Sequence, residues 1–319
     1  RNNDHSPGCA TNYVGGRLRL THRIYPNHED EMLGPRETEG GGWEDRKQKE
    51  IEHSDRRRQI VTGYEYQTDT SDHDLRRDFV KNHEEYEKHF SNTKFYSITR
   101  SSFACRDALL YTGIQGKTVL DYCCGNGEIG VAMAAHGAER VHGIDISQVA
   151  ADNATGLARI EEVGDRCSFE VMDAENMRFE DNTFDVVHEY GALHHLDLEA
   201  AFGETSRVLK PGGRLVCSEA LRHNPLIHNY RKRTMHLRTE WEVDHILGVP
   251  EILSGAKYFE NVKVQFFHLA ALGAIPFRKH RFFSSLLGAL ERVDSLLLGI
   301  PYLQRLAWVA VIEYSNPRK

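Results

Sequence analysis

The feature that most constrains the fold of this chain is a strand, a glycine-rich turn and a helix that follow one another in the stretch TVLDYCCGNGEIG. Asp121 ends the short apolar strand, the turn carries Gly125, Gly127 and Gly130, and the apolar run after it predicts a helix. Such a turn presents backbone N–H groups and a helix N-terminus to a ligand. Glycine is needed there because it tolerates positive φ and lets the main chain approach a ligand closely.

The same glycines fit the dinucleotide fingerprint Gly-x-Gly-x-x-Gly, with the acidic Asp145 following at about the expected ~20 residues. A plain structural turn is another interpretation. Asp121 favours a different ligand, because a carboxylate at the strand end can accept a charge-assisted hydrogen bond from an ammonium group. The pyrophosphate of a nicotinamide dinucleotide would instead be repelled by it.

The stretch resembles the class I S-adenosylmethionine (SAM)-dependent methyltransferases, in which a strand ending in an acid is followed by a Gly-x-Gly turn. Cys123 stands where this family usually has a first glycine, so a Cβ must fit beside the methionine part of the cofactor. Further motifs over about 100 residues resemble the branch that mostly methylates small molecules. They are Phe184-Asp185, Leu193-His194-His195-Leu196 and RVLKPGG at residues 207–213. The resemblance is specific over residues 117–220.

Short apolar runs separated by helix-length segments predict a Rossmann-like, doubly wound α/β fold with a seven-stranded sheet. The sheet is expected to be mostly parallel with an antiparallel last strand. The predicted parallel strands are residues 118–121, 140–145, 167–172, 183–189 and 214–220. Residues 262–269 and 307–314 are expected to form a closing antiparallel pair, with a helical insertion between them.

The chain is predicted to divide into three parts. Residues 1–60 read as a polar, flexible arm, residues 61–112 as a helical cap, and residues 113–319 as the methyltransferase domain. Insertions at 221–255 and 275–306 are expected to act as substrate or lid elements. The second insertion is rich in Leu and Phe, and suits a lid, a homodimer surface or a lipid contact.

The composition argues against several classes of protein. A net charge of −7 over 319 residues is unlike a protein that binds nucleic acid through bulk charge, and no nucleic-acid partner is expected. The six cysteines include no CxxC pair, which indicates a reducing, cytoplasmic setting without disulfides or zinc. No apolar run reaches the ~18 residues of a membrane span. The basic run at residues 56–58 is expected on a solvated face.

The resemblance implies that acids at successive strand ends hold the cofactor. Asp121 would take the amino group, Asp145 the ribose hydroxyls and Asp173 the adenine amino group, although Asp145 could instead cap a helix. The candidate cofactor contacts are Asp121, Cys123, Gly125, Gly127, Asp145, Ile146, Asp173, Ala174, Glu189 and Tyr96. Tyr86 and Arg100, in the segment that commonly folds over the cofactor in this family, are further candidates, with a packing role as the alternative.

Three residues near the fourth predicted strand are candidate catalytic groups. His194 and His195 are candidate general bases, because histidine titrates near neutrality and a hydroxyl nucleophile benefits from a base. Structural packing of one of them is the alternative. Glu189 could steady the cofactor or a cationic substrate, or cap the following helix.

The segment after the fifth predicted strand is dense in His and Arg, and in this fold it usually builds the substrate pocket. Arginine there could pair with a carboxylate or phosphate on the substrate. The candidate substrate residues are Tyr190, His223, Asn224, Arg231 and His245. The histidine spacings give no clean ligand set with a carboxylate, so no metal is expected.

The sequence therefore predicts a SAM-dependent methyltransferase of class EC 2.1.1 that methylates a small molecule at O, N, S or C, with an anionic group as a candidate feature of that molecule. An NAD-linked oxidoreductase is the first alternative. A lipid- or quinone-type methyltransferase at a membrane surface and a catalytically silent subunit of the same fold are the others.

Overall fold

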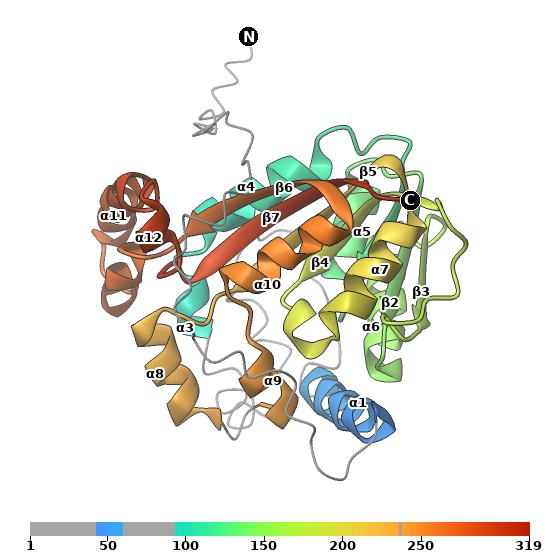
Figure 1. The fold of residues 1–319 in the computed structure, drawn as a ribbon, viewed down its shortest axis with the longest axis horizontal. Coiled ribbons are helices and arrows are strands. Elements are labelled where there is room, and N and C mark those ends of the chain that lie inside the picture. Colours follow the sequence, from blue (N-terminus) through green and yellow to red (C-terminus); the bar gives the residue numbers. More distant parts are fainter. Residues whose placement is uncertain (1–42, 60–92, 236–237) are drawn as a thin grey trace. The chain divides into compact units, whose positions relative to one another are not determined.

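A seven-stranded sheet organises the computed structural model, which describes residues 43–59, 93–235 and 238–319 (Figure 1). Its strand order is β3-β2-β1-β4-β5-β7-β6. The strands are β1 (Thr118–Tyr122), β2 (Arg140–Asp145), β3 (Cys167–Val171), β4 (Phe184–Tyr190), β5 (Leu209–Ala220), β6 (Phe259–Phe267) and β7 (Val309–Pro317). β1 to β5 pair in parallel, and β7 runs antiparallel to both β5 and β6. The predicted doubly wound sheet is confirmed.

Helices α5 and α6 pack on one face of this sheet, and α7 and α10 on the other. The described helices are α1 (Trp43–Gln59), α3 (Thr93–Tyr96), α4 (Arg100–Tyr111), α5 (Glu128–Ala135), α6 (Gln148–Ile160), α7 (Leu198–Val208), α8 (Pro225–Arg233), α9 (Glu240–His245), α10 (Val249–Ser254), α11 (Phe283–Leu297) and α12 (Pro301–Gln304). The described residues also form the 3₁₀ segments η2 (Leu193–His195), η4 (Gly255–Lys257) and η5 (Ala271–Phe277). Within the described ranges, no helix has the length and apolar character needed to cross a bilayer.

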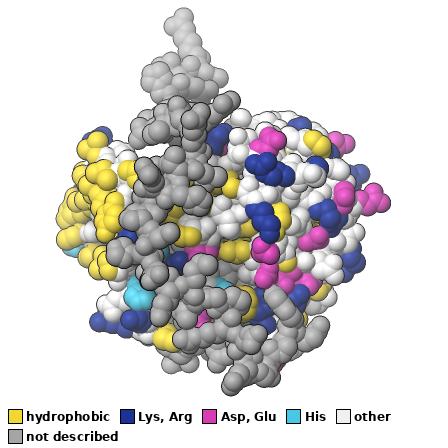
Figure 2. Space-filling view, viewed as in Figure 1, with side chains coloured by type: hydrophobic (Ala, Val, Ile, Leu, Met, Phe, Trp, Pro, Cys, Tyr) yellow, Lys and Arg dark blue, Asp and Glu magenta, His cyan; other side chains and the backbone are white. Residues whose placement is uncertain are grey.

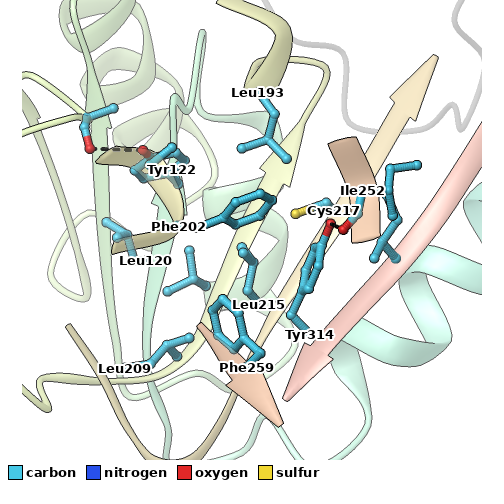
Figure 3. Packing of buried hydrophobic residues seen from close by; sticks show 14 of the residues in the cluster. Leu120, Tyr122, Leu193, Phe202, Leu209, Leu215, Cys217, Ile252, Phe259 and Tyr314 are labelled. Atoms are coloured by element: carbon cyan, nitrogen blue, oxygen red, sulfur yellow. Dashed lines mark hydrogen bonds between the residues drawn. The ribbon is translucent and has the colours of Figure 1, made fainter. Parts of the chain in front are cut away.

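The alternation of side chains along β1 produces two cores, one on each face of the sheet. Leu120 and Tyr122 point into a cluster with α7 and α10, whereas Val119 points into a cluster with α5 and α6. In the first cluster Phe202 packs beside Tyr314, whose hydroxyl donates to the Ile252 carbonyl at 2.9 Å (Figure 3). Burial of both faces explains why the parallel strands read as short apolar runs.

Contacts along the chain define two units, Arg1–Asp45 and Arg46–Lys319, and the sheet belongs to the second. The predicted boundaries at residues 60 and 112 stay predictions. The last part of the predicted arm is not an irregular tail, because Trp43–Gln59 forms α1. The second insertion is helical as predicted and consists of η5, α11 and α12.

Candidate active site

A cavity of about 620 Å³ lies at the C-terminal ends of the parallel strands. Strand order divides its lining into two regions. The region above β3, β2 and β1, called here the glycine-turn end, is lined by Asp121, Cys123, Cys124, Gly125, Asn126, Asp145, Ile146, Asp173 and Ala174. The region above β4, β5 and β7, called the aromatic end, is lined by Phe95, Tyr96, Phe103, Tyr190, Ser218, Ile227, Tyr230, Arg231, Trp308 and Val309. The predicted cofactor residues other than Gly127 and Glu189 thus share one cavity.

The glycine turn has the left-handed backbone that its sequence predicts. Gly125 has φ +54° and Gly127 has φ +80°. A Cβ on Gly127 would lie 2.6 Å from the Ala154 Cβ, so a glycine is needed there to let α5 and α6 pack closely. Cys123 also has positive φ, at +56°, which explains why glycine would suit that position.

Asp121 is buried beneath this turn and is already held by the protein. One carboxylate oxygen accepts the Gly130 N–H at 2.8 Å, and the other lies 3.0 Å from Nδ1 of the buried His188. Burial raises the pKa of Asp121, and the contacts with His188 and Gly130 oppose that shift. Nε2 of His188 is buried without a hydrogen-bond partner, and His188 lines the cavity.

Asp145 braces the turn from the end of β2. Its carboxylate accepts the Gly125 N–H at 2.9 Å and the Ser147 N–H at 3.0 Å. The N-cap of α6 is Ser147 itself, whose hydroxyl accepts the Ala150 N–H. Because each carboxylate oxygen has two acceptor sites, Asp145 can still accept hydrogen bonds from a ligand.

Helix α1 brings cations to the acids at the end of β3. Lys47 pairs with Asp173. Nη2 of Arg46 donates to both carboxylate oxygens of Glu175, at 2.6 and 2.7 Å. Asp173 also accepts the Glu175 N–H at 2.9 Å. Sequence reasoning missed these cations, because α1 is charged along its whole length and shows little amphipathic pattern.

Arg58 corrects the expectation that residues 56–58 form a solvated face. Its side chain is half-buried and lines the cavity, and a Cβ on Gly125 would lie 2.7 Å from its guanidinium. Its Nε is buried without a hydrogen-bond partner. The guanidinium therefore lies directly over the glycine turn.

His194 and His195 both line the cavity but differ in their partners. Nδ1 of His194 lies 3.0 Å from the fully buried carboxylate of Glu219, and burial lowers the pKa of His194 well below its usual value. Nδ1 of His195 lies 2.9 Å from Glu50 of α1. Burial lowers the pKa of His195, but the pairing with Glu50 outweighs it, so the net pKa is raised. At neutral pH His194 is therefore uncharged, whereas the pairing with Glu50 favours the charged form of His195.

Glu189 lies behind the cavity wall rather than on it. It is fully buried, and one of its oxygens accepts the N–H groups of Ala192 and Leu193. Burial and the neighbouring Glu219 raise the pKa of Glu189 well above its usual value, and burial raises that of Glu219 to about 7. Glu189 thus caps the η2 turn beside Glu219.

Of the predicted substrate residues, Tyr190 and Arg231 reach the cavity. Arg231 donates to the Leu221 carbonyl at 2.8 Å, and burial lowers its pKa to about 10. The hydroxyl of Ser218, which sequence reasoning missed, is buried in the aromatic end without a hydrogen-bond partner. Among the described side chains, Ser218 is a candidate contact for a polar group of a bound molecule.

The structure does not bring the other three predicted substrate residues to this cavity. His223 lines a separate cavity of about 210 Å³, Asn224 caps α8 by accepting the Leu226 and Ile227 N–H groups, and His245 stacks on Trp241. The Asn-Pro pair that suggested a pocket turn is the N-cap and first residue of α8.

Two further expectations fall outside the site. Arg100 does not line the cavity and pairs with Glu291 of α11 at 2.6 Å. Tyr86 lies outside the described residues. Across residues 43–59, 93–235 and 238–319, no group of three or more His, Cys, Asp or Glu side chains is arranged to hold a metal ion.

Comparison with known proteins identifies residues 119–213 as matching a family model described as a methyltransferase domain. A 27-O-demethylrifamycin SV methyltransferase from Amycolatopsis mediterranei is 39% identical over 107 residues, which cover 33% of this chain and 39% of that protein. A demethylmenaquinone methyltransferase from Lactiplantibacillus plantarum is 39% identical over 104 residues, covering 32% and 44%. The chain spans about two fifths of the length of these relatives.

Among solved structures, a geranyl diphosphate C-methyltransferase from Streptomyces coelicolor, determined with Mg²⁺, geranyl diphosphate and S-adenosyl-L-homocysteine, superimposes with a TM-score of 0.53. The match covers 86% of this chain and 98% of that one at 18% identity. At this identity the likeness shows a shared fold.

Proposed function

Because residues 119–213 match a family model described as a methyltransferase domain, we propose that the protein transfers the methyl group of SAM to a small-molecule acceptor bound at the aromatic end. The observation that carries this proposal is the single cavity shared by the strand-end acids, the glycine turn and His194. SAM supplies a methyl group already activated on a sulfonium, so the protein must mainly position the reactants and accept a proton.

The residues at the glycine-turn end fit SAM. Asp145 keeps free acceptor sites for the ribose hydroxyls, and Asp173 does so for the adenine amino group. Buried polar atoms without protein partners, His188 Nε2 and Arg58 Nε, belong to residues that line the same cavity, next to Asp121 and Gly125 respectively. Such atoms are costly to bury unpaired, which supports a polar ligand beside them.

Arg58 is our candidate for the carboxylate of the cofactor. Its guanidinium lies over Gly125, and arginine pairs with carboxylates through two parallel hydrogen bonds. Asp121, below the turn, is the corresponding candidate for the cofactor amino group. The two side chains would then hold the two ends of the amino-acid part.

His194 is our candidate base. Its lowered pKa keeps the ring neutral and able to take a proton, while Glu219 at 3.0 Å accepts from the other ring nitrogen and fixes its tautomer. His195 suits a different role, because its pairing with Glu50 favours the charged form. We assign His195 to holding α1 against the site.

The aromatic end points to the chemistry of the acceptor. Its lining combines aromatic rings from Phe95, Tyr230 and Trp308 with two polar groups, Ser218 and Arg231. This lining favours a largely apolar, ring-bearing or isoprenoid molecule with one polar group near the methyl donor. Both curated relatives are named for small-molecule acceptors, which agrees with this class.

The proposal is tested by incubating the protein with deuterium-labelled SAM and a panel of phenols, quinones, prenyl compounds and amines, with product masses read by mass spectrometry. We expect one apolar acceptor to gain a single labelled methyl group. A panel without any labelled product, from protein that binds SAM, would contradict the assignment of the aromatic end.

A further inference from the structure

The surface over η5, α11 and α12 is unusually apolar. Of the eleven large hydrophobic side chains exposed in the part of the chain that the structure describes, six lie here. They are Phe277, Phe282, Val293, Leu296, Ile300 and Tyr302, called here the apolar patch. Figure 2 shows hydrophobic side chains gathered over these helices at the left of the view. Exposed apolar groups gathered in this way mark an interaction site more often than scattered ones do.

Helix α11 has a buried apolar face and also exposes apolar residues near its C-terminal end, among the exposed Ser284, Ser285, Arg292 and Ser295. On the inner face, Leu287 is buried, and Leu290 packs against the cluster that contains Ile275 and Trp308. On the outer face, Val293 is 41% exposed and Leu296 is 76% exposed. A surface helix normally presents polar residues outward, so the exposed pair Val293 and Leu296 is expected to have a partner.

Cations surround one end of the apolar patch. Phe277, His280 and Phe282 form an exposed aromatic cluster with ring centroids 5.3 to 6.0 Å apart, and the residues between them are the exposed Arg278, Lys279 and Arg281. Arg292 and Arg305 are also exposed in this segment.

The nearby acids do not offset these cations. Glu291 pairs with Arg100, and the buried Asp294 accepts the N–H groups of Leu269, Ala270 and Ala271. The surface is therefore apolar and positive on a chain whose net charge is −7.

From this combination we propose that the apolar patch docks on the surface of a bilayer that contains anionic phospholipids. Aromatic and aliphatic side chains would enter the headgroup boundary while Arg278, Lys279 and Arg281 contact the anionic headgroups. A second copy of the chain fits less well, since a two-fold dimer through the patch would bury the same cations from both copies in one interface.

A packed apolar cluster lies between η5, α11 and the cavity. Three residues of this cluster, Phe95, Ile227 and Trp308, also line the aromatic end. The same cluster contains Leu272 of η5 and Leu287 of α11. If the proposed function holds, an apolar acceptor would bind close to the docked membrane surface, with this cluster between them. Membrane docking itself does not depend on that function.

The test is co-sedimentation of the full chain with phosphatidylcholine vesicles, with and without phosphatidylglycerol. We expect binding only with the anionic lipid, reduced by salt. The variant K279E/R281E should bind about 25-fold more weakly, since each cation near the surface contributes about fivefold. The variant F282S/L296S should lose at least about tenfold.

Matched controls change equally exposed residues elsewhere, with L226S/I160S for the apolar pair and R140E/R159E for the charged pair. These controls should bind vesicles like the wild type. Calorimetric binding of SAM to every variant establishes folding separately from docking. A wild type that stays in the supernatant with anionic vesicles overturns the proposal. A dimer that F282S/L296S converts to monomer, without vesicle binding, overturns it in favour of a second copy.

Discussion

The two ends of the cavity are built in different ways. The glycine-turn end comes from the tips of three neighbouring parallel strands, and its acids are held by backbone N–H groups of the same turns. The aromatic end is assembled from α3, α4, α8 and the ends of β4, β5 and β7, which are far apart in the sequence. The first end has a fixed geometry suited to one ligand, whereas the second can change its specificity through its inserted segments without disturbing the sheet.

Replacing Asp145 with alanine is expected to have the largest effect at the glycine-turn end. Two ribose hydroxyls and the N–H groups of Gly125 and Ser147 would lose their acceptor, so the Kd for SAM should rise by about 10² to 10³-fold. Asp185→Ala is the matched control, because that carboxylate also accepts a backbone N–H and pairs with lysines, but at the opposite edge of the sheet. Equal affinities in the two variants, by calorimetry, would refute the site map.

Replacing His194 with alanine tests the candidate general base next to the aromatic end. The kcat should fall by about 10²-fold, because a general base contributes about that much, while the Kd for SAM stays unchanged. His195→Ala should lower kcat less, since His195 is paired with Glu50. His228→Ala, at an exposed histidine of α8, is the control and should leave both kcat and the Kd for SAM unchanged. Steady-state kinetics with calorimetry measure both effects, and parallel losses in kcat and SAM affinity would argue for a packing role of His194.

Arg58 of α1 lies over the glycine turn and is part of the glycine-turn end of the cavity. Arg58→Ala should weaken SAM binding by about 10-fold or more through loss of a charge-assisted contact, whereas Arg56→Ala, exposed on the same helix, should leave the Kd unchanged. Methionine-free analogues such as adenosine provide the sharper test. Their affinity should not change in Arg58→Ala, and a loss there would remove Arg58 from the amino-acid part of the site.

The smallest effect concerns pH. The Glu50–His195 pair should stabilise the fold fully between pH 4.5 and 6.5, the usual pKa values of the two groups, because the pKa of Glu50 is lowered and that of His195 is raised in the folded protein. Its contribution is lost as pH rises through the raised pKa of His195 or falls through the lowered pKa of Glu50.

Glu50→Gln should therefore reduce the free energy of unfolding by about 1 to 2 kcal/mol in that window and by less at alkaline pH. Denaturant titrations at several pH values measure this difference. Glu52→Gln, exposed on the same helix, is the control and should show no such pH dependence. A constant difference at all pH values would mean that the pair is not formed.

The sequence carried enough information for the sheet and for one half of the cavity. Apolar runs with an acid at the strand end identified β1 and β2, because both faces of the strands are buried and their ends meet at one edge. Asp121, Asp145 and Asp173, which that rule and the family resemblance together assigned to the cofactor, all line the cavity.

The other half depends on contacts between distant segments. Lys47 pairs with Asp173 and Glu50 with His195, across more than a hundred residues of sequence, and no local periodicity signals such ion pairs. Asn224 was misassigned although the Asn-Pro signal of a capped helix was present. The aromatic end was predicted less well because the inserted segments that form it carry no local sequence pattern that indicates their contacts.

The most direct measurement of the central claim is isothermal calorimetry of the wild-type chain with S-adenosyl-L-homocysteine and, separately, with NADH. The strand-end acids and Arg58 predict binding of one S-adenosyl-L-homocysteine per chain and no heat from NADH. Tight binding of NADH, with none of S-adenosyl-L-homocysteine, would contradict the account.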